Sequence, residues 1–177
     1  ACEAAPNFAP ALSGLTHAMY YAYMHGYVED REAFLGLAYD KGRAAVAADE
    51  RDADAHFAVG RILYLRRDID QSIAEFEAAI SQNPSFAHAH MGLGTALVFD
   101  GQLDRSIECT DQALRLSPND PLHWLIRAVK GLALLCKGSF EEAVHVLQEG
   151  VRQPTAAWTA YCLLTAAYGY TDDSSRA

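Results

Sequence analysis

Residues 59–84 read VGRILYLRRDIDQSIAEFEAAISQNP, and residues 93–118, one period of 34 positions later, read LGTALVFDGQLDRSIECTDQALRLSP. Both stretches carry glycine second, serine fourteenth and proline last, with apolar residues matched between these points. A fixed period of this length is typical of helical repeats, in which one unit cannot bury its apolar face without stacking on its neighbours. The spacing therefore predicts an all-α repeat array.

Each unit is expected to contain two helices. Apolar and small residues recur every three or four positions in residues 53–65 and again in residues 69–80, which predicts two amphipathic helices. Gly60 lies inside the first helix despite a cost of about 1 kcal/mol relative to alanine, so we expect the second helix to approach closely there, with Ser72 at the crossing. Pro84 ends the second helix because it has no amide donor.

The repeat register extends over the whole chain, with one local change of spacing. Gly101 recurs as Gly138 after 37 residues, and Gly138 recurs as Gly169 after 31, so one helix gains about a turn that the next connection loses. Neither end shows a polar capping helix, so we expect the chain to be a piece of a longer protein. We expect a single array in which residues 1–6 are the remnant of a preceding helix, 7–50 an enlarged first repeat, 53–86, 87–120 and 121–154 further repeats, and 155–177 a truncated last repeat.

The unit that runs from Leu93-Gly94 through Ser106 and Ala113 to Pro118 resembles the tetratricopeptide repeat family, whose repeat has a Leu-Gly pair, a small residue, Ala and Pro at these places. The resemblance covers about residues 6–177. It implies a right-handed α-solenoid of stacked antiparallel helix pairs. It also implies a protein that binds other proteins.

The sequence departs from the family pattern at four positions, one of which is Glu50 in place of a proline. His56 and His90 stand where the family usually carries tryptophan, and Thr110 replaces the second aromatic residue. The two histidines share one register position on successive first helices, so either packed histidines or a shared metal ion would account for them. No third ligand accompanies them in register, and we expect no metal and no cofactor.

Composition excludes several classes of protein. The chain has 51% hydrophobic residues and a formal charge of -9, and no apolar run approaches the ~18 residues that span a bilayer. An acidic surface repels phosphate backbones, so we expect no direct contact with nucleic acid. The four cysteines show no paired spacing, which favours reduced thiols and a cytoplasmic protein.

Motifs of catalysis are missing from the sequence. It contains no glycine-rich phosphate loop, no Gly-x-Ser-x-Gly elbow and no pair of histidines four apart beside a glutamate. The dispersed glutamates are most simply solvated helix faces. We therefore expect no enzyme activity.

The resemblance to the repeat family also implies a binding surface. In that family the first helices of successive units line a concave groove that receives a peptide or a partner helix. Aromatic anchors, a flexible methionine and one arginine suit such capture, although Phe57, Met91 and Phe99 would equally well pack between helices. Carried over by register, the groove comprises Asp54, Phe57, Arg61, Tyr64, His88, Met91, Thr95, Val98 and Phe99.

The enlarged first repeat is rich in tyrosine. Tyr20, Tyr21, Tyr23 and Tyr27 lie close together before a long second helix of about residues 30–48. Tyrosine combines a large apolar ring with a hydroxyl group that needs a partner. The cluster is therefore either a secondary ligand pocket or an aromatic patch covered by the long helix.

Residues 117–122, SPNDPL, open an extended helix of the kind found in the repeat regions of bacterial class III adenylate cyclases and winged-helix regulators. This similarity implies a regulatory module of a larger bacterial signalling protein. Its partner would be a protein or peptide, such as an attached output domain or a second copy in a homodimer. The alternatives are a free-standing adaptor or assembly scaffold, and a sensor of a small ligand or metal.

Overall fold

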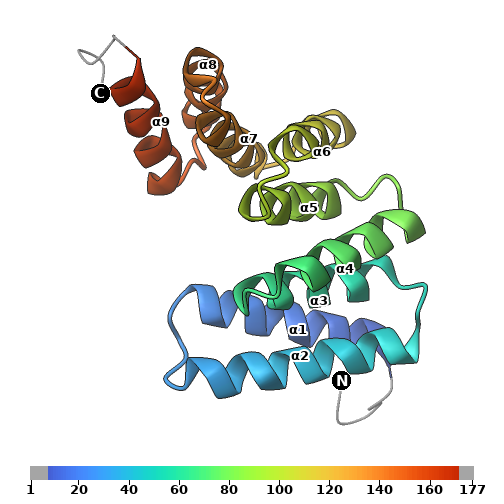
Figure 1. The fold of residues 1–177 in the computed structure, drawn as a ribbon. Coiled ribbons are helices and arrows are strands. Elements are labelled where there is room, and N and C mark those ends of the chain that lie inside the picture. Colours follow the sequence, from blue (N-terminus) through green and yellow to red (C-terminus); the bar gives the residue numbers. More distant parts are fainter. Residues whose placement is uncertain (1–7, 172–177) are drawn as a thin grey trace. The chain divides into compact units, whose positions relative to one another are not determined.

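A computed structural model describes residues 8–171, which form helices and no strand (Figure 1). None of these helices is long and apolar enough to cross a bilayer. The expectations for residues 1–6 and for those after Thr171 lie outside the described residues. The helices are α1 (Ala9–Met24), α2 (Arg31–Ala48), α3 (Ala53–Leu65), α4 (Ile69–Gln82), α5 (Ala87–Phe99), α6 (Leu103–Leu116), α7 (His123–Lys137), α8 (Phe140–Val151) and α9 (Trp158–Tyr170).

The predicted all-α fold of helix pairs is confirmed. The two stripes that the sequence shows in residues 53–65 and 69–80 form α3 and α4. Aspartates begin two of the helices: Asp30 accepts a hydrogen bond from the amide of Ala33 at 3.1 Å, and Asp52 accepts one from the amide of Asp54 at 2.9 Å. These caps satisfy amides that have no partner within the first turn.

The chain divides into two compact units at Gly92 and Leu93, within α5. In the first unit, α1 packs on α2 and α3, and α3 packs on α2 and α4 (Figure 1). The first unit therefore has an apolar interior between its helices. Two clusters of buried residues form it, one with Leu12, Ala45, Val46, Ala55, Val59 and Leu63 and the other with Met19, Leu35, Ala38 and Ile62.

The second unit is built in the same manner. Here α7 packs on α6, α8 and α9, and α8 also packs on α9. Apolar residues on these helices are buried against one another, so each helix pair is covered by the next. The buried clusters comprise Leu134, Ala143, Val146, Leu147 and Ala167, and Val98, Val129 and Ala133.

The helix crossing predicted at Gly60 and Ser72 is confirmed. The hydroxyl of Ser72 donates to the carbonyl oxygen of Gly60 at 2.8 Å, across the α3–α4 pair. A Cβ atom on Gly60 would lie 2.8 Å from the ring of Phe76, so only glycine allows this approach. Glycine and serine thus fix how closely the two helices approach.

The equivalent positions in the second unit use the same contact. Ser106 donates to the carbonyl oxygen of Gly94 at 2.8 Å, one period after the first pair. A Cβ atom on Gly94 would lie 3.0 Å from the methyl group of Thr110, the residue that replaces Phe76 in this register. Thr110 also donates to the carbonyl oxygens of its own helix, at Ser106 and Ile107.

In three helix pairs, the turn between the helices contains a residue in the left-handed backbone conformation. Gly101 and Gly138 have φ values of 80° and 83°, and Arg67 has a φ of 68° at the equivalent position. Glycine adopts this conformation freely, whereas a side chain makes it unfavourable by about 1–2 kcal/mol. Within residues 8–171, Arg67 is the only residue other than glycine with a positive φ.

Candidate partner-binding face of the first unit

Most of the predicted groove residues lie in the first unit. Asp54, Arg61 and Tyr64 are half-buried on α3, and His88 and Met91 are half-buried on the part of α5 that belongs to this unit. Phe57 differs from them, because its side chain is buried, at 7% exposure. The first unit therefore places the polar members of the predicted set at its surface and one aromatic member beneath.

Arg61 is surrounded by aromatic rings. Its guanidinium carbon lies 3.4 Å from the ring centroid of Tyr20, 4.7 Å from that of Tyr21 and 5.4 Å from that of Phe57. A planar cation over the face of a ring is attracted by the ring quadrupole and loses rotational freedom. The rings of α1 and α3 thus hold the guanidinium in a fixed orientation.

His17 of α1 connects Arg61 with Asp54. A guanidinium nitrogen of Arg61 lies 3.2 Å from Nδ1 of His17, and Nε2 of His17 lies 3.1 Å from a carboxylate oxygen of Asp54. Because a guanidinium can only donate, Nδ1 of His17 accepts, and Nε2 carries the proton that is donated to Asp54. The three side chains form one hydrogen-bonded network, in which His17 of α1 lies between Arg61 and Asp54 of α3.

The hydrogen bond from His17 lowers the pKa of Asp54 below its ordinary value of 3.8. The positive charge of Arg61 acts in the same direction, while burial opposes both by disfavouring the charged form. Asp54 is therefore a carboxylate whose charge is already compensated within the protein. Burial raises the pKa of the nearby Tyr64, whose hydroxyl group accordingly stays protonated.

Phe57 supports this surface from beneath. Its ring centroid lies 5.8 Å from that of Phe76 and 5.0 Å from that of Phe86, and His88 stacks on it at 6.5 Å. Rings at these separations and angles contribute about 0.5–1.5 kcal/mol per pair beyond their buried area. Phe57 is therefore part of the packing that positions Arg61.

The four tyrosines predicted as a secondary pocket have different surroundings. Tyr20 packs on Arg61, and Tyr23 packs on Arg31, whose guanidinium carbon lies 4.0 Å from its ring centroid. Tyr21 is 50% exposed and Tyr27 is 82% exposed. Whether any of them binds a ligand remains a prediction.

Tyr23 also lines an open hollow at the end of the first unit. This hollow lies between the end of α1, the start of α2 and the end of α3. The other residues that line it are Arg31, Glu32, Leu35, Leu65 and Arg66.

The two histidines considered as metal ligands are hydrogen-bonded within the protein. Nε2 of His56 donates to the carbonyl oxygen of Glu50 at 3.0 Å, and Nε2 of His90 donates to that of Pro84 at the same distance. Nδ1 of His56 lies 2.6 Å from a carboxylate oxygen of Glu75. Residues 8–171 contain no group of three or more His, Cys, Asp or Glu residues that could hold a metal ion. The repeated histidine thus ties the loop before each first helix to that helix.

The remaining groove residues, Thr95, Val98 and Phe99, lie in the second unit. Val98 is buried against Val129 and Ala133, whereas Phe99 is 49% exposed. Their role in binding stays a prediction.

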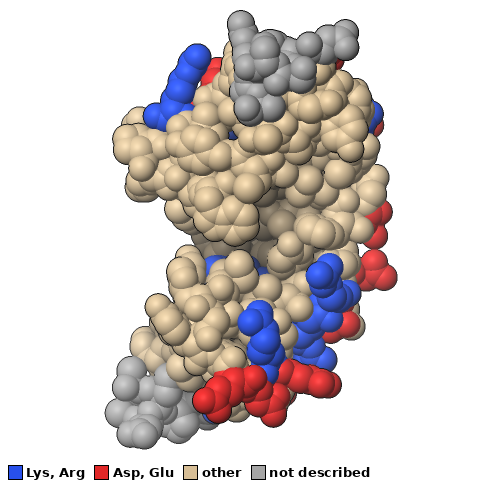
Figure 2. All heavy atoms as spheres, turned by 90° about the vertical axis from the view of Figure 1, so that its left-hand side faces the viewer, with Lys and Arg blue, Asp and Glu red and all other residues tan. Residues whose placement is uncertain are grey.

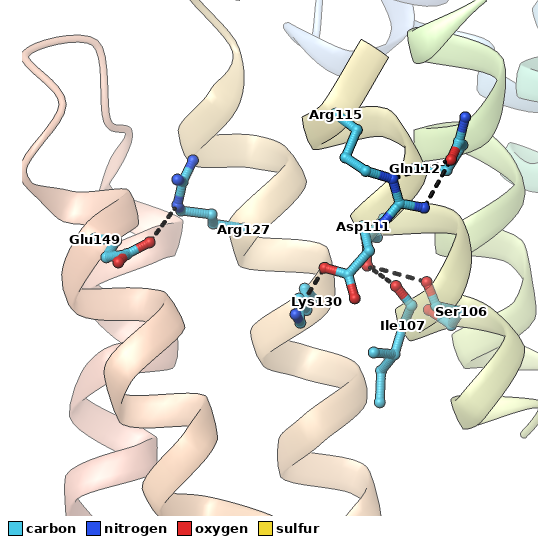
Figure 3. Close-up of polar contacts among 9 residues, drawn as sticks. Ser106, Ile107, Asp111, Gln112, Arg115, Arg127, Lys130 and Glu149 are labelled. Atoms are coloured by element: carbon cyan, nitrogen blue, oxygen red, sulfur yellow. Dashed lines mark hydrogen bonds and ion pairs between the residues drawn. The ribbon is translucent and has the colours of Figure 1, made fainter. Parts of the chain in front are cut away.

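Charged side chains that link helices of the second unit are paired. Lys130 of α7 lies 2.7 Å from a carboxylate oxygen of Asp111 on α6, and Arg127 of α7 lies 3.1 Å from one of Glu149 on α8 (Figure 3). Figure 2 shows that Lys and Arg side chains also lie beside Asp and Glu side chains over the first unit, at the lower end of the view. The ion pairs of Lys130 and Arg127 therefore stabilise contacts between helices of the second unit.

Sequence reasoning did not find His17. It lies on α1, where the repeat register is obscured by the enlarged first unit, and a single histidine carries no motif. Its role depends on α1 packing against α3, which brings together residues 37 and 44 positions apart. A register that aligned α1 with α3 could have placed it beside Asp54.

The family model for the Tetratricopeptide repeat matches residues 42–85, 66–121 and 91–161, which together cover more than half of the chain. No curated protein is significantly similar to the chain in sequence. The sequence match rests on helices of both units.

Several solved structures are similar to the chain. YrrB, described as a TPR protein with an unusual peptide-binding site, has 19% identity and a TM-score of 0.66, over 97% of this chain and 82% of YrrB. TTC0263 from Thermus thermophilus has 19% identity and a TM-score of 0.73, over 94% of this chain and 84% of TTC0263. MamA has 22% identity and a TM-score of 0.65, over 86% of this chain and 81% of MamA. At these identities the likeness shows the fold alone.

Proposed function

The chain belongs to the tetratricopeptide repeat family, and we propose that it binds a polypeptide segment on the face of its first unit formed by α1 and α3. This face comprises Tyr20, Tyr21 and Met24 of α1 and Arg61 and Tyr64 of α3. All five residues belong to the first unit. YrrB is described as having a peptide-binding site, which supports the same kind of role for this fold.

One observation carries the proposal: large side chains are exposed beside a rigidly held arginine. Tyr21 and Met24 are 50% and 54% exposed, on the helix whose Tyr20 stacks on Arg61. Tyrosine, methionine and arginine are enriched in protein interfaces, where rings give contact area at little entropic cost. The helices fix the backbone of these residues, so little backbone freedom is lost on binding.

Peptide selection on the immobilised protein tests the proposal. Peptides from a random library are selected, synthesised and titrated by fluorescence anisotropy against the wild-type protein and against Tyr21→Ser and Met24→Ser. We expect each substitution to weaken binding by about tenfold, because an apolar contact in the interface is lost. Leu37→Ser is the matched control, since Leu37 is equally exposed but lies on α2. Unchanged affinity in both α1 variants would contradict the proposal.

We further propose that the chain is a regulatory module of a bacterial cytoplasmic signalling protein. The similarity of residues 117–122 to repeat regions beside cyclase and winged-helix domains supports this context. The partner would then be an attached output domain or a protein that controls it, and no catalysis is assigned to the repeats themselves. A free-standing adaptor is the alternative. The full reading frame distinguishes the two, because an adaptor would carry no catalytic or DNA-binding domain.

A further inference from the structure

We infer that His17 makes peptide binding on the face formed by α1 and α3 depend on pH, through its hydrogen bond with Arg61. The inference rests on the proposed function and names a regulation of the same site. The binding-competent state is the one in this structure, in which the imidazole of His17 is neutral. Uptake of a proton by His17 breaks its contact with Arg61 and weakens binding.

The contact between Arg61 and His17 exists only while the imidazole is neutral. A guanidinium nitrogen of Arg61 lies 3.2 Å from Nδ1 of His17, and a guanidinium has no acceptor. Nδ1 therefore accepts, while the proton of the neutral ring lies on Nε2 and is donated to Asp54 at 3.1 Å. A second proton can be added only at Nδ1. It would turn the acceptor of Arg61 into a donor and place a second positive charge beside the guanidinium.

The charged groups around His17 come from one neighbouring helix. On α3 it faces the cation of Arg61 and the carboxylate of Asp54, and on its own helix Tyr20 and Tyr21 pack on Arg61. Helix α2 also packs on α1, but among the described residues no charged side chain of α2 makes a hydrogen bond or ion pair with His17. An added proton therefore strengthens the hydrogen bond to Asp54 and removes the one from Arg61.

The proton can be taken up in a physiological range of pH. Histidine changes its charge between about pH 5 and 8, and the side chain of His17 is 20% exposed, which allows exchange with water. The hydrogen bond from His17 lowers the pKa of Asp54, so that carboxylate stays charged over the whole range. The arrangement around Arg61 therefore changes with the charge of His17 alone.

Loss of the histidine contact affects the exposed part of the face. The guanidinium carbon of Arg61 lies 3.4 Å from the ring centroid of Tyr20 and 4.7 Å from that of Tyr21, which is 50% exposed. While His17 is neutral, a hydrogen bond and these rings together fix the guanidinium. Once the hydrogen bond is lost, Arg61 and the rings around it have to be ordered again when a peptide binds, which lowers the affinity.

The second unit contains the same kind of contact with an additional anchor. A guanidinium nitrogen of Arg127 lies 3.1 Å from Nδ1 of His123, and the same arginine donates to the carboxylate of Glu149 at 3.1 Å. Because of this ion pair, Arg127 keeps its position when its histidine contact is lost. Arg127 is therefore an internal reference for a pH titration of Arg61.

NMR of the free protein tests the structural step of the inference. The imidazole nitrogen shifts of His17 and the Nε–H shift of Arg61 are followed from about pH 8 to about pH 5, the range in which histidines titrate. We expect the Arg61 signal to change with the same midpoint as His17, and the Arg127 signal not to follow it. An Arg61 signal that stays in place while His17 gains its proton would overturn the inference, with or without a peptide.

Binding at the two ends of this range tests the regulatory step. Peptides selected on the wild-type protein are chosen without histidine, acetylated at the N-terminus, and titrated against the wild-type protein, His17→Gln and His25→Gln. We expect the wild-type affinity to fall by about tenfold towards the lower pH, a coupling of ordinary size between two ligands. His17→Gln should show one affinity at both pH values, because glutamine takes up no proton.

His25→Gln is the matched control for these titrations. His25 follows the last turn of α1, stacks on Tyr27 and is exposed, so its replacement should leave the fall in affinity unchanged. Circular dichroism at both pH values establishes that each variant is folded.

Two binding results would overturn the inference alone. They are a wild-type affinity that is equal at both pH values, and a fall that His17→Gln retains in full, while Tyr21→Ser and Met24→Ser still weaken binding. A different result, in which no peptide is selected or none depends on Tyr21 and Met24, would contradict the proposed function, and the inference with it.

Discussion

The two units are built from the same kind of helix pair but differ in the side chain at the helix crossing and in the partner of a half-buried arginine. In the first unit Phe76 lies at the helix crossing beneath the face that bears Arg61, which has no carboxylate partner among the described residues. In the second unit Thr110 takes the place of Phe76, and Arg127 is paired with Glu149. The half-buried arginine of the first unit is thus held by rings, whereas that of the second unit is paired with a carboxylate.

The ion pair of Arg127 with Glu149 links α7 to α8, whereas Arg61 contacts rings and His17. The contact of serine with a glycine carbonyl is the same in both units, at 2.8 Å. What changes is the pairing of the half-buried arginine.

The largest expected effect concerns the residue at the helix crossing. Phe76→Ala should lower the free energy of unfolding by about 3–5 kcal/mol, since a fully packed ring leaves a cavity. Thr110→Ala should cost only about 1 kcal/mol, because it removes a hydroxyl bonded to its own helix. Urea unfolding followed by circular dichroism measures both. Equal losses would mean that the two crossings are packed alike.

A second substitution tests why glycine is needed at the crossing. Gly60→Ala should destabilise the protein, because overpacking costs about 1–3 kcal/mol and outweighs the gain in helix propensity. In a Phe76→Leu background the same substitution should cost less, since the added methyl group would otherwise meet the ring. Additive losses in the urea-unfolding cycle would show that Gly60 and Phe76 do not restrict each other.

The connection after α3 gives a smaller effect of opposite sign. Arg67→Gly should stabilise the protein by about 0.5–1 kcal/mol, because Arg67 has φ of 68° where the equivalent residues are glycines. Gly101→Ala is the matched change in the second unit and should destabilise it by a similar amount. Thermal unfolding measures both variants, and a loss of stability in Arg67→Gly would indicate that its side chain makes a contact worth more than the strain.

The smallest effect is a dependence on pH. The folded-state pKa of Asp54 is lowered, first by the hydrogen bond from His17, so its contribution to stability is present above 3.8 and is lost as pH falls through the folded value. Wild-type protein should therefore lose more stability below about pH 4 than Asp54→Asn does. Asp54 is 49% exposed, which makes the difference small. Urea unfolding of both proteins at a series of decreasing pH values would detect the difference. The same decrease in the free energy of unfolding with pH in both proteins would mean that Asp54 is not held by His17.

Much of the fold could be predicted from the sequence, because it follows from periodic burial. The stripes of α3 and α4, the close approach at Gly60 and the crossing at Ser72 each follow from residue type and spacing. Such features depend on neighbours within one repeat. They are therefore visible without a structure.

The candidate site was only partly predictable. The position of Arg61 in the 34-residue repeat predicts that it lies in the groove. Its surroundings depend on α1, which lies outside the regular spacing. The same repeat position predicts Phe57 as a groove residue, but its side chain is buried because Phe76 and Phe86 pack against it. Register gives the side of a helix, whereas exposure depends on what neighbouring helices place against that side.

The central claim is that the α1–α3 face of the first unit recognises the partner. NMR shifts of the backbone amides and of the arginine Nε–H groups, followed as a selected peptide is added to isotope-labelled protein, are the measurement that tests it. We expect the largest shifts at His17, Tyr21 and the side chain of Arg61, with little change around Arg127 and Glu149. Shifts concentrated on α6–α9, with Arg61 unmoved at saturation, would contradict it.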